Sequence, residues 1–300
     1  MKHFLFLLFL SSQLVAVDHL ILHFDINNTL IAEDRLGNKS QSDVVNYHLA
    51  RKYTYLWDDT LVEPISYATY VYNHLVPGGQ KDQHLKSLRK KHLDQFIPFL
   101  EKTNHPLHKE ISENFEMIQQ KLQTNPSFIF TSFYKLLDAL NIPYTLHLRS
   151  YGNDHQIVID EIERTQGKTF FTEVIHFKKG ILHTSDGVFS TPHEIYQILL
   201  KNQAIKDDWL HWHSHGETER FGKPFYIDQE NLDIVELFFD DHVDDEIVNC
   251  RDAKTGKPLK LRNAFNVDTL AAIADDDYFI NLIKNLALTP ADKLFTIDSI

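Results

Sequence analysis

Apolar runs that end abruptly in acidic residues are the clearest pattern along this chain. Residues 20–24 form one such run and lead directly into Asp25, and residues 235–239 form another and lead into Asp240 and Asp241. Apolar runs of this kind are typical of strands that are buried in a parallel sheet. We therefore expect two buried strands, each of which carries a carboxylate at its carboxyl end.

Further strands and helices alternate through the second half of the chain. Apolar residues at helical spacing predict helices, and shorter apolar runs bounded by turn residues predict strands. The predicted elements are helices near residues 129–140, 157–162, 193–202 and 279–288, a strand at 144–148, and a hairpin that joins 169–177 to 181–184. This alternation predicts an α/β fold with a Rossmann-like, doubly wound parallel sheet and crossover helices.

A mainly helical block is predicted between the first strand and the rest of the sheet. Residues 40–53 should form a helix that is capped by Ser40 or Ser42, and residues 85–122 are also helical in pattern. Within that second helical region, the basic run at residues 89–92 is best explained as a solvated helix face.

The chain is expected to divide into a leader, a core and a cap. Residues 1–17 are predicted to be an export signal, with a short basic start, a dense apolar centre at residues 4–10 and an exit of small residues. The core would comprise residues 18–34 and 126–300. Residues 35–125 would be inserted after the first strand as the helical cap.

The predicted signal peptide implies a protein that is exported to a periplasm or to the extracellular medium; if residues 1–17 are not a signal, the chain is cytoplasmic. Their apolar run is too short to span a bilayer. Sequons for N-glycosylation start at Asn27 and Asn38. A glycan on Asn27 would block the strand end that follows Asp25, so a working site there fits a compartment without glycosylation.

The composition is that of a globular protein with an acidic balance. Of the 300 residues, 43% are hydrophobic and 24% are charged, and the formal net charge is -12. A field of this sign repels phosphate backbones and argues against nucleic acid as a partner. It is compatible with a small phosphorylated substrate, because a metal ion can reverse the charge locally. The single cysteine, Cys250, excludes an internal disulfide, and its apolar neighbours indicate a packing role.

Polar residues stand at three predicted strand ends, which is where ligands bind in open α/β sheets. Asp25 ends the first strand, Ser150 follows the middle one, and Asp240 and Asp241 end the last, with Asp245 beyond. A carboxylate can attack phosphorus, and further carboxylates can hold a hard cation such as Mg2+. A hydroxyl and a cationic side chain can bind the remaining phosphate oxygens.

The order of these residues resembles the motifs of the haloacid dehalogenase-like (HAD-like) superfamily. Residues 25–29, Asp-Ile-Asn-Asn-Thr, resemble its first motif, Asp-x-Asp-x-Thr, and residues 238–245 resemble its fourth, an apolar strand followed by Asp-Asp-x-x-x-Asp. Ser150 resembles the second motif. Lys223, which lies in a Gly-Lys-Pro loop ahead of the acidic strand, resembles the third and is the best candidate for the cation. The long interval between the first two motifs matches an inserted cap.

The resemblance implies a Mg2+-dependent phosphatase or phosphotransferase that acts through an aspartyl-phosphate intermediate on a small phosphorylated substrate or a phosphoprotein. Asp25 would attack phosphorus, and Ser150 and Lys223 would bind the transferred group. The implied metal ligands and the acids that assist them are Asp25, Asp241, the backbone carbonyl of Asn27, Asp240 and Asp245.

The first motif departs from the family pattern at Asn27. Phosphatases of the superfamily carry an Asp here, which protonates the leaving oxygen and then activates water. An amide cannot deliver a proton near neutral pH, so alkyl phosphates should react slowly unless Glu33, Asp34 or a cap histidine substitutes. A catalytically degenerate binding or effector protein is therefore the main alternative, and C–halogen or C–P cleavage is a further one.

A group of histidines allows a separate interpretation. His211, His213 and His215 alternate, so on a strand their imidazoles would all face one side. Three imidazoles with an open position can hold a catalytic zinc ion. This alternative predicts a zinc-binding protein whose metal depends on these histidines and not on Asp25 or Asp241, and a loop in this stretch would remove the alignment.

Overall fold

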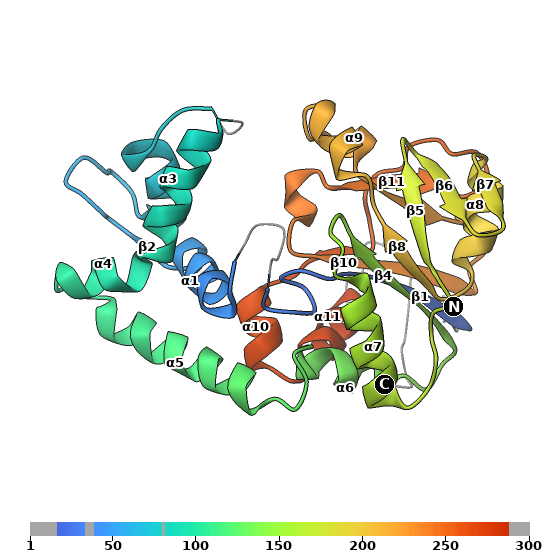
Figure 1. Cartoon of the computed structure of the whole chain (residues 1–300), viewed down its shortest axis with the longest axis horizontal. Coiled ribbons are helices and arrows are strands. Elements are labelled where there is room, and N and C mark those ends of the chain that lie inside the picture. The colour runs from blue at the N-terminus through green and yellow to red at the C-terminus, as the bar shows by residue number, and fades with distance from the viewer. Residues whose placement is uncertain (1–16, 34–38, 80–81, 288–300) are drawn as a thin grey trace, which may run out of the picture.

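The computed structural model describes residues 17–33, 39–79 and 82–287 of the chain. The predicted export signal, apart from Val17, and the sequon at Asn38 lie outside these residues. The described part combines one large sheet, the helices that flank it, and a helical insertion that extends to one side (Figure 1).

An eight-stranded sheet forms the core, in the order β12-β10-β1-β4-β8-β5-β6-β7. Neighbours from β12 to β5 run parallel, and β5, β6 and β7 continue as antiparallel neighbours. The sheet confirms the predicted Rossmann-like α/β fold. Its strands are β1 (His19–Asp25), β4 (Tyr144–Ser150), β5 (Val174–Lys178), β6 (Ile181–Thr184), β7 (Gly187–Phe189), β8 (Gln203–Lys206), β10 (Ile234–Asp240) and β12 (Ala264–Asn266).

Helices and a smaller sheet cover the two faces of the large sheet. The small sheet pairs β9 and β11 in parallel. No helix within the described residues is both long and apolar enough to cross a bilayer. The remaining elements of the core are α6 (Thr131–Ala139), α7 (His155–Gln166), α8 (Pro192–Leu199), α9 (Trp209–Ser214), the 3-10 helices η2 (Glu219–Phe221) and η3 (Val243–Asp245), β9 (Lys223–Ile227), β11 (Val248–Asp252), α10 (Thr269–Ala274) and α11 (Tyr278–Ala287).

Side chains that alternate along the strands fill separate cores on the two faces. Leu22 and Phe24 of β1 belong to the main core, which α6, α7, α10 and α11 also build. Phe238 of β10 points the other way, into a core formed with β9 and β11. Because successive residues of a strand face opposite sides, an apolar run without alternation is what burial on both faces requires.

The central strands place their carboxyl ends at one edge of the sheet. β1 lies between β4 and β10, and all three run parallel. Asp25 is in register with Arg149 of β4, and Phe24 is in register with Phe239 of β10. The residues that follow the end of β1 are therefore neighbours in space of those that follow β4 and β10, although β1 ends more than 100 positions before either of them.

The segment between β1 and α6 is mainly helical and extends from one end of the sheet (Figure 1). Its inner residues, such as Val45, Leu49 and Phe96, share one continuous hydrophobic core with β1 and β10. The predicted helical region at residues 85–122 consists of three helices. The elements are α1 (Gln41–Lys52), β2 (Thr54–Tyr55), β3 (Ile65–Ser66), α2 (Tyr67–Tyr70), the π-helix η1 (Val71–Leu75), α3 (Gln83–Asp94), α4 (Phe96–Lys102) and α5 (His108–Thr124).

The basic run on α3 differs from the predicted solvated face at Arg89. This side chain is 2% exposed, and its guanidinium donates to the backbone oxygens of Val76 at 3.0 Å and Gly78 at 2.8 Å. It also lies over the ring of Tyr72. A charge pattern cannot distinguish a solvated arginine from one that folds back onto the carbonyls of a neighbouring turn, because both occur in the same kind of helical sequence.

Ser40 rather than Ser42 caps α1, in a capping box with Asp43: the Ser40 hydroxyl accepts from the Asp43 amide and the Asp43 carboxylate accepts from the Ser40 amide at 2.9 Å. We expect Ser40→Ala to lower the free energy of unfolding by about 1 kcal/mol. Ser42→Ala is the matched control and should leave it unchanged or slightly higher, because alanine is the better helix former. Urea unfolding measures both, and equal effects of the two changes would contradict the cap.

Candidate functional site

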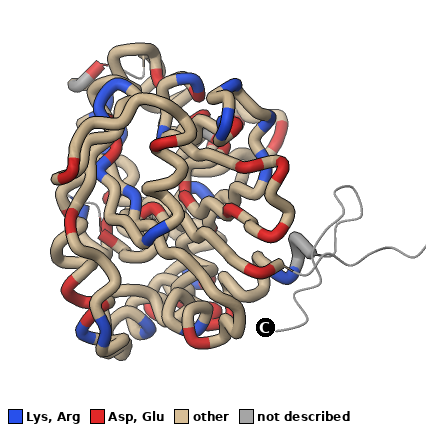
Figure 2. The backbone as a smooth tube through the Cα atoms, turned by 90° about the vertical axis from the view of Figure 1, so that its right-hand side faces the viewer, with Lys and Arg blue, Asp and Glu red and all other residues tan. Residues whose placement is uncertain are grey.

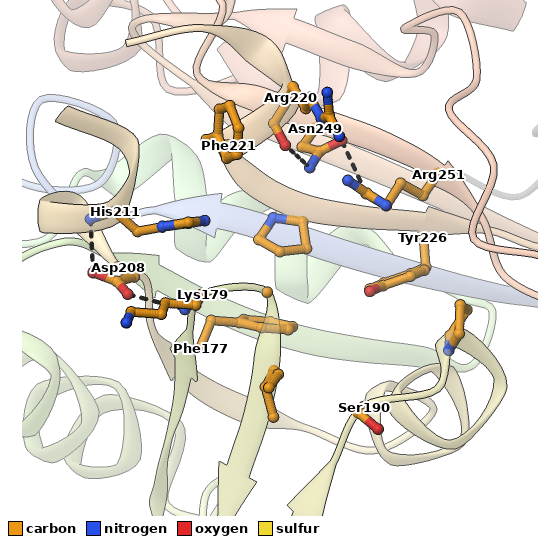
Figure 3. Close-up of a pocket in the computed structure, with 15 residues that line it drawn as sticks. Phe177, Lys179, Ser190, Asp208, His211, Arg220, Phe221, Tyr226, Asn249 and Arg251 are labelled. Atoms are coloured by element: carbon orange, nitrogen blue, oxygen red, sulfur yellow. Dashed lines mark hydrogen bonds between the residues drawn. The ribbon is translucent and has the colours of Figure 1, made fainter. Parts of the chain in front are cut away.

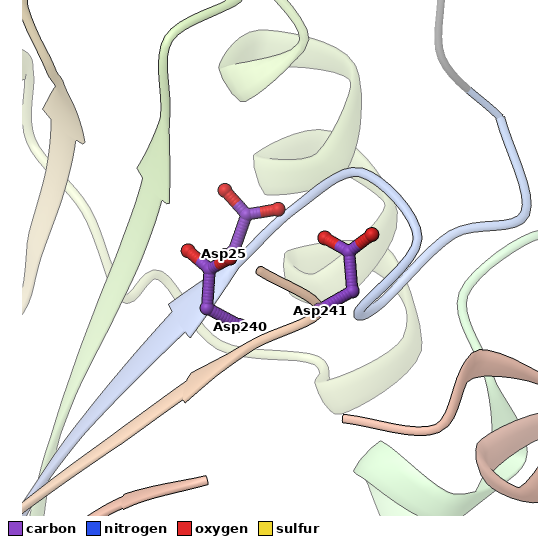
Figure 4. Close-up of side chains that lie close together, drawn as sticks. All are labelled: Asp25, Asp240 and Asp241. Atoms are coloured by element: carbon purple, nitrogen blue, oxygen red, sulfur yellow. The ribbon is translucent and has the colours of Figure 1, made fainter. Parts of the chain in front are cut away.

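Three buried carboxylates meet where β1 and β10 end. Asp25, Asp240 and Asp241 each contribute an oxygen to a group in which all the atoms lie within 4.8 Å of one another. Their side chains point to the same side of the sheet edge (Figure 4). Within the described ranges, no other group of three or more acidic, histidine or cysteine side chains comes as close together.

Lys223 lies between two of these carboxylates. Its ammonium donates to Oδ1 of Asp25 at 2.5 Å and to Oδ2 of Asp240 at 2.6 Å, and the side chain is 1% exposed. The preceding Gly222 makes this position possible, because a Cβ there would lie 2.2 Å from the backbone oxygen of Ile247. Only glycine allows the start of β9 to approach β11 this closely.

The charges of this group depend on each other. Burial raises the pKa of Asp25, and its acidic neighbours raise it further, while Lys223 opposes both effects. Burial also raises the pKa of Asp241. For Lys223, burial disfavours the ammonium, but Asp240 and Asp25 outweigh it and raise the pKa above its usual value. One ammonium therefore faces three carboxyl groups whose burial and mutual repulsion raise the pKa values of Asp25 and Asp241, and a further cation would relieve that repulsion.

The hydrogen bonds show which oxygens remain for that cation. Both oxygens of Asp240 are occupied, one by Lys223 and the other by the amide of His242 at 2.9 Å. Asp25 keeps Oδ2 and Asp241 keeps Oδ1 without a hydrogen bond from any described residue. A pair of carboxylate oxygens on adjacent strand ends is the donor chemistry that Mg2+ prefers, so the residues present fit this ion.

The turn after β1 adds polar atoms to the same place. Asn28 adopts a left-handed conformation with a φ of 60°, and its side chain donates to Oδ2 of Asp241 at 3.2 Å. Its backbone oxygen accepts from the hydroxyl of Thr269 at 2.6 Å, which fixes the turn against α10. Oδ1 of Asn27, Oδ1 of Asn28 and the hydroxyl of Thr29 are buried without a partner among the described residues. Buried polar atoms without partners are rare, and here they favour a ligand at this turn.

Asn27 contacts a carboxylate that the sequence motifs did not single out. Its Nδ2 donates to Oδ2 of Asp154 at 3.2 Å, and Asp154 is buried just ahead of α7. Its position between the strand end at Ser150 and the start of a helix is the signal that could have marked it. Of the substitutes predicted for the missing acid, Asp34 lies outside the described residues.

Ser150 and Asp245 are less closely linked to the acidic group. Ser150 is buried at the end of β4, where its Oγ accepts from the amide of Gly152 at 2.8 Å, and no hydrogen bond joins it to the three carboxylates. The backbone of Asp245 ends η3 next to the acidic strand end, and its side chain lies outside the described part. Asp25, Lys223, Asp240 and Asp241 are thus the predicted site residues that the fold brings into contact.

A buried polar network supports the site from below. Arg149 forms a bidentate ion pair with Asp207, in which Nε donates to Oδ2 at 2.9 Å and Nη2 donates to Oδ1 at 2.5 Å. Both side chains are buried. The same guanidinium donates to the backbone oxygen of Pro224 at 3.0 Å. Since Pro224 follows Lys223 directly, this contact ties the position of the lysine to β4 and to the end of β8. The apolar pattern of β4 gave no sign of this network.

The three histidines of the zinc alternative lie on a helix, not on a strand. The segment forms α9, in which residues two positions apart point in different directions. His211 and His215 lie together with ring centres 4.4 Å apart, whereas His213 stacks on Trp209 and pairs with Glu217. The common face that zinc binding would need is therefore absent from this segment.

Comparisons of the chain with protein-family models, with curated proteins and with solved structures gave no match. The geometry and chemistry of the described residues therefore carry the functional argument.

His147, in the layer below the site, predicts a dependence of stability on pH. Burial lowers its pKa from 6.5 to about 3, and its Nε2 faces the backbone oxygen of Lys201 at 3.0 Å. Between these pH values only the unfolded chain binds the proton, so the free energy of unfolding falls as pH falls, by up to about 1.4 kcal/mol per pH unit from this group.

Replacing His147 should remove its contribution to the change of the free energy of unfolding with pH. We expect the stability of His147→Gln to decline less steeply than that of the wild type from pH 6.5 to 4, as measured by urea unfolding. His193→Gln, at an exposed position of α8, is the matched control and should follow the wild type. An unchanged slope in His147→Gln would show that its imidazole does not control this transition.

Proposed function

We propose that the chain is a HAD-like phosphoric-ester hydrolase or phosphotransferase that depends on Mg2+ and uses Asp25 as its nucleophile. The observation that carries this proposal is the meeting of Asp25, Asp240 and Asp241 around the buried ammonium of Lys223. A carboxylate nucleophile, a second carboxylate with a free oxygen and a fixed cation at one strand edge are what phosphoryl transfer requires.

The residues support a two-step reaction. Oδ2 of Asp25, which is free of hydrogen bonds from described residues, forms a bond to phosphorus as the bond to the leaving oxygen breaks. Lys223 holds the other oxygen of Asp25 and so fixes the direction of attack. Water then cleaves the aspartyl-phosphate and restores the carboxylate. Asp241, through Oδ1, would hold Mg2+ together with Oδ1 of Asp25, which has a second lone pair beside its hydrogen bond from Lys223. When bound, the ion would offset charge on the phosphate oxygens.

Proton transfer is the step for which this chain differs from the family pattern. Asn27 cannot protonate a leaving oxygen, but its amide is held against Asp154. We propose that Asp154 takes over part of this role by passing a proton to the leaving oxygen through an intervening water, while Asn27 holds the Asp154 carboxylate in position. Asn27 also favours the alternative, a non-catalytic binding protein, because the first motif has no acid at this position.

Turnover of an aryl phosphate tests the nucleophile. We expect the purified protein to hydrolyse p-nitrophenyl phosphate in the presence of Mg2+, because this leaving group needs little protonation. Asp25→Asn should lower kcat by about a thousandfold or more, with the fold retained by circular dichroism. Asp160→Asn, on the exposed face of α7, is the matched control. Activity of Asp25→Asn at the wild-type level would exclude Asp25 as the nucleophile.

A single substitution tests the missing acid. Asn27→Asp would place a carboxylate beside Asp154, and two neighbouring carboxyl groups favour one that stays protonated near neutral pH. We expect a gain of about a hundredfold in kcat on an alkyl phosphate such as glycerol phosphate, and little gain on p-nitrophenyl phosphate. Asn153→Asp, at an exposed position nearby, should change neither rate. If Asn27→Asp and the wild type are both inactive, the binding-protein alternative is favoured.

A further inference from the structure

A cavity lies on the opposite side of β9 from the acidic group formed by Asp25, Asp240 and Asp241. The side chain of Lys223 points to the carboxylates, and its neighbours Gly222 and Pro224 line the cavity. Alternate residues of a strand face opposite sides, so the two sites are separated by β9 itself. The cavity has a volume of about 360 Å³, which is within the range of small-molecule sites.

The small sheet forms one wall of this cavity. Tyr226 of β9 and Arg251 of β11 are in register and face the same way, as do Pro224 and Asn249. Phe177, at the end of β5, lies on the opposite wall (Figure 3). Strands of both sheets therefore contribute to the cavity walls, together with residues of α9 and η2, which suits a site that binds a small ligand.

The lining is cationic, although the whole chain has a net charge of -12. Lys179, Arg220 and Arg251 line the cavity, and none of them forms an ion pair with a described acidic side chain. The only acid in the lining is Asp208, whose carboxylate accepts from the backbone amides of Lys179 and His211, both at 3.0 Å. The excess positive charge favours an anionic ligand.

Arg251 is the side chain best placed to bind that anion. Its Nε donates to Oδ1 of Asn249 at 3.1 Å and its Nη1 donates to the backbone oxygen of Gly256 at 3.2 Å, so neutral groups fix its direction. Its second terminal nitrogen has no partner among the described residues. The hydroxyl of Tyr226 is also without one, on the strand paired with that of Arg251.

The opposite end of the cavity carries the aromatic side chains, next to Lys179 and Asp208 (Figure 3). Phe177, Phe221 and His211 surround it, whereas Arg251 and Tyr226 lie toward the other end (Figure 3). His211 and Phe221 stand edge to face, with ring centres 5.2 Å apart. An arrangement of ring faces at one end and a guanidinium at the other is complementary to a flat ring that carries an acidic group.

We propose that this cavity is a binding site for a small aromatic anion, such as an aryl carboxylate, sulfonate or phosphate. The ring lies among Phe177, Phe221 and His211, and the acidic group accepts hydrogen bonds from Arg251 and Tyr226. The site is separate from the acidic group at Asp25 and does not require that group to be catalytic.

Calorimetric titration with naphthalene-1-sulfonate tests the site, because this aromatic anion has no phosphoric ester to hydrolyse. We expect saturable binding at one site per chain, at least tenfold weaker in Arg251→Gln and severalfold weaker in Tyr226→Phe. The neutral naphthalene-1-sulfonamide should bind at least tenfold more weakly than the sulfonate. Arg164→Gln removes the same charge from an exposed position of α7 and should not change the affinity.

Asp25→Asn should bind the sulfonate as the wild type does, which separates this proposal from the proposed phosphoryl transfer. The proposal is overturned if the wild type shows no saturable binding, if the sulfonamide binds equally well, or if Arg251→Gln keeps full affinity. Should Arg251→Gln fail to fold, Tyr226→Phe decides, since it removes one hydroxyl and leaves the ring in place. Unchanged affinity in that variant would then overturn the proposal.

Discussion

The buried ammonium of Lys223 is the contact on which the candidate site depends. Its Nζ lies 2.5 Å from Oδ1 of Asp25 and 2.6 Å from Oδ2 of Asp240, and this cation offsets the repulsion that two ionised carboxylates would have at a buried strand edge. Removing one partner of a buried ion pair typically costs about 3–5 kcal/mol, because the other charge is left unpaired. Asp25 and Asp240 come from different strands, so the lysine also joins β1 to β10 and couples the stability of the fold to the chemistry of the site.

The surrounding structure holds that lysine in place. Gly222 permits the close approach of β9 to β11, and Arg149 fixes the backbone next to Lys223 from the other side. Arg149 is itself paired with Asp207, so two buried ion pairs lie in successive layers below the strand edge. The hydrogen bond from Arg149 to the backbone oxygen of Pro224 links the two ion pairs. A buried polar network whose members are hydrogen-bonded in this way is held in one arrangement.

The strand β9 gives the molecule two sites of opposite charge. One side presents the acidic group, which is the proposed site for Mg2+ and a phosphate. The other presents Arg251 and a ring-lined cavity suited to an organic anion. Alternate residues of the same strand serve the two proposed sites, because Lys223 faces the carboxylates while Gly222 and Pro224 line the cavity.

The sequence alone predicted the strands that end at Asp25 and Asp240 and the α/β alternation that indicates a Rossmann-like sheet, because an apolar run closed by an acid is a local pattern that burial imposes. It also singled out Asp25, Asp240, Asp241 and Lys223 as candidates, but it did not predict β8, β9 or β11, and it placed Lys223 in a loop although this residue begins β9. Only the tertiary structure placed Asp154 against Asn27, buried Arg89, and turned His211 and its neighbours into a helix. These outcomes depend on contacts between residues far apart in the chain, and no local pattern of polar and apolar residues records such contacts.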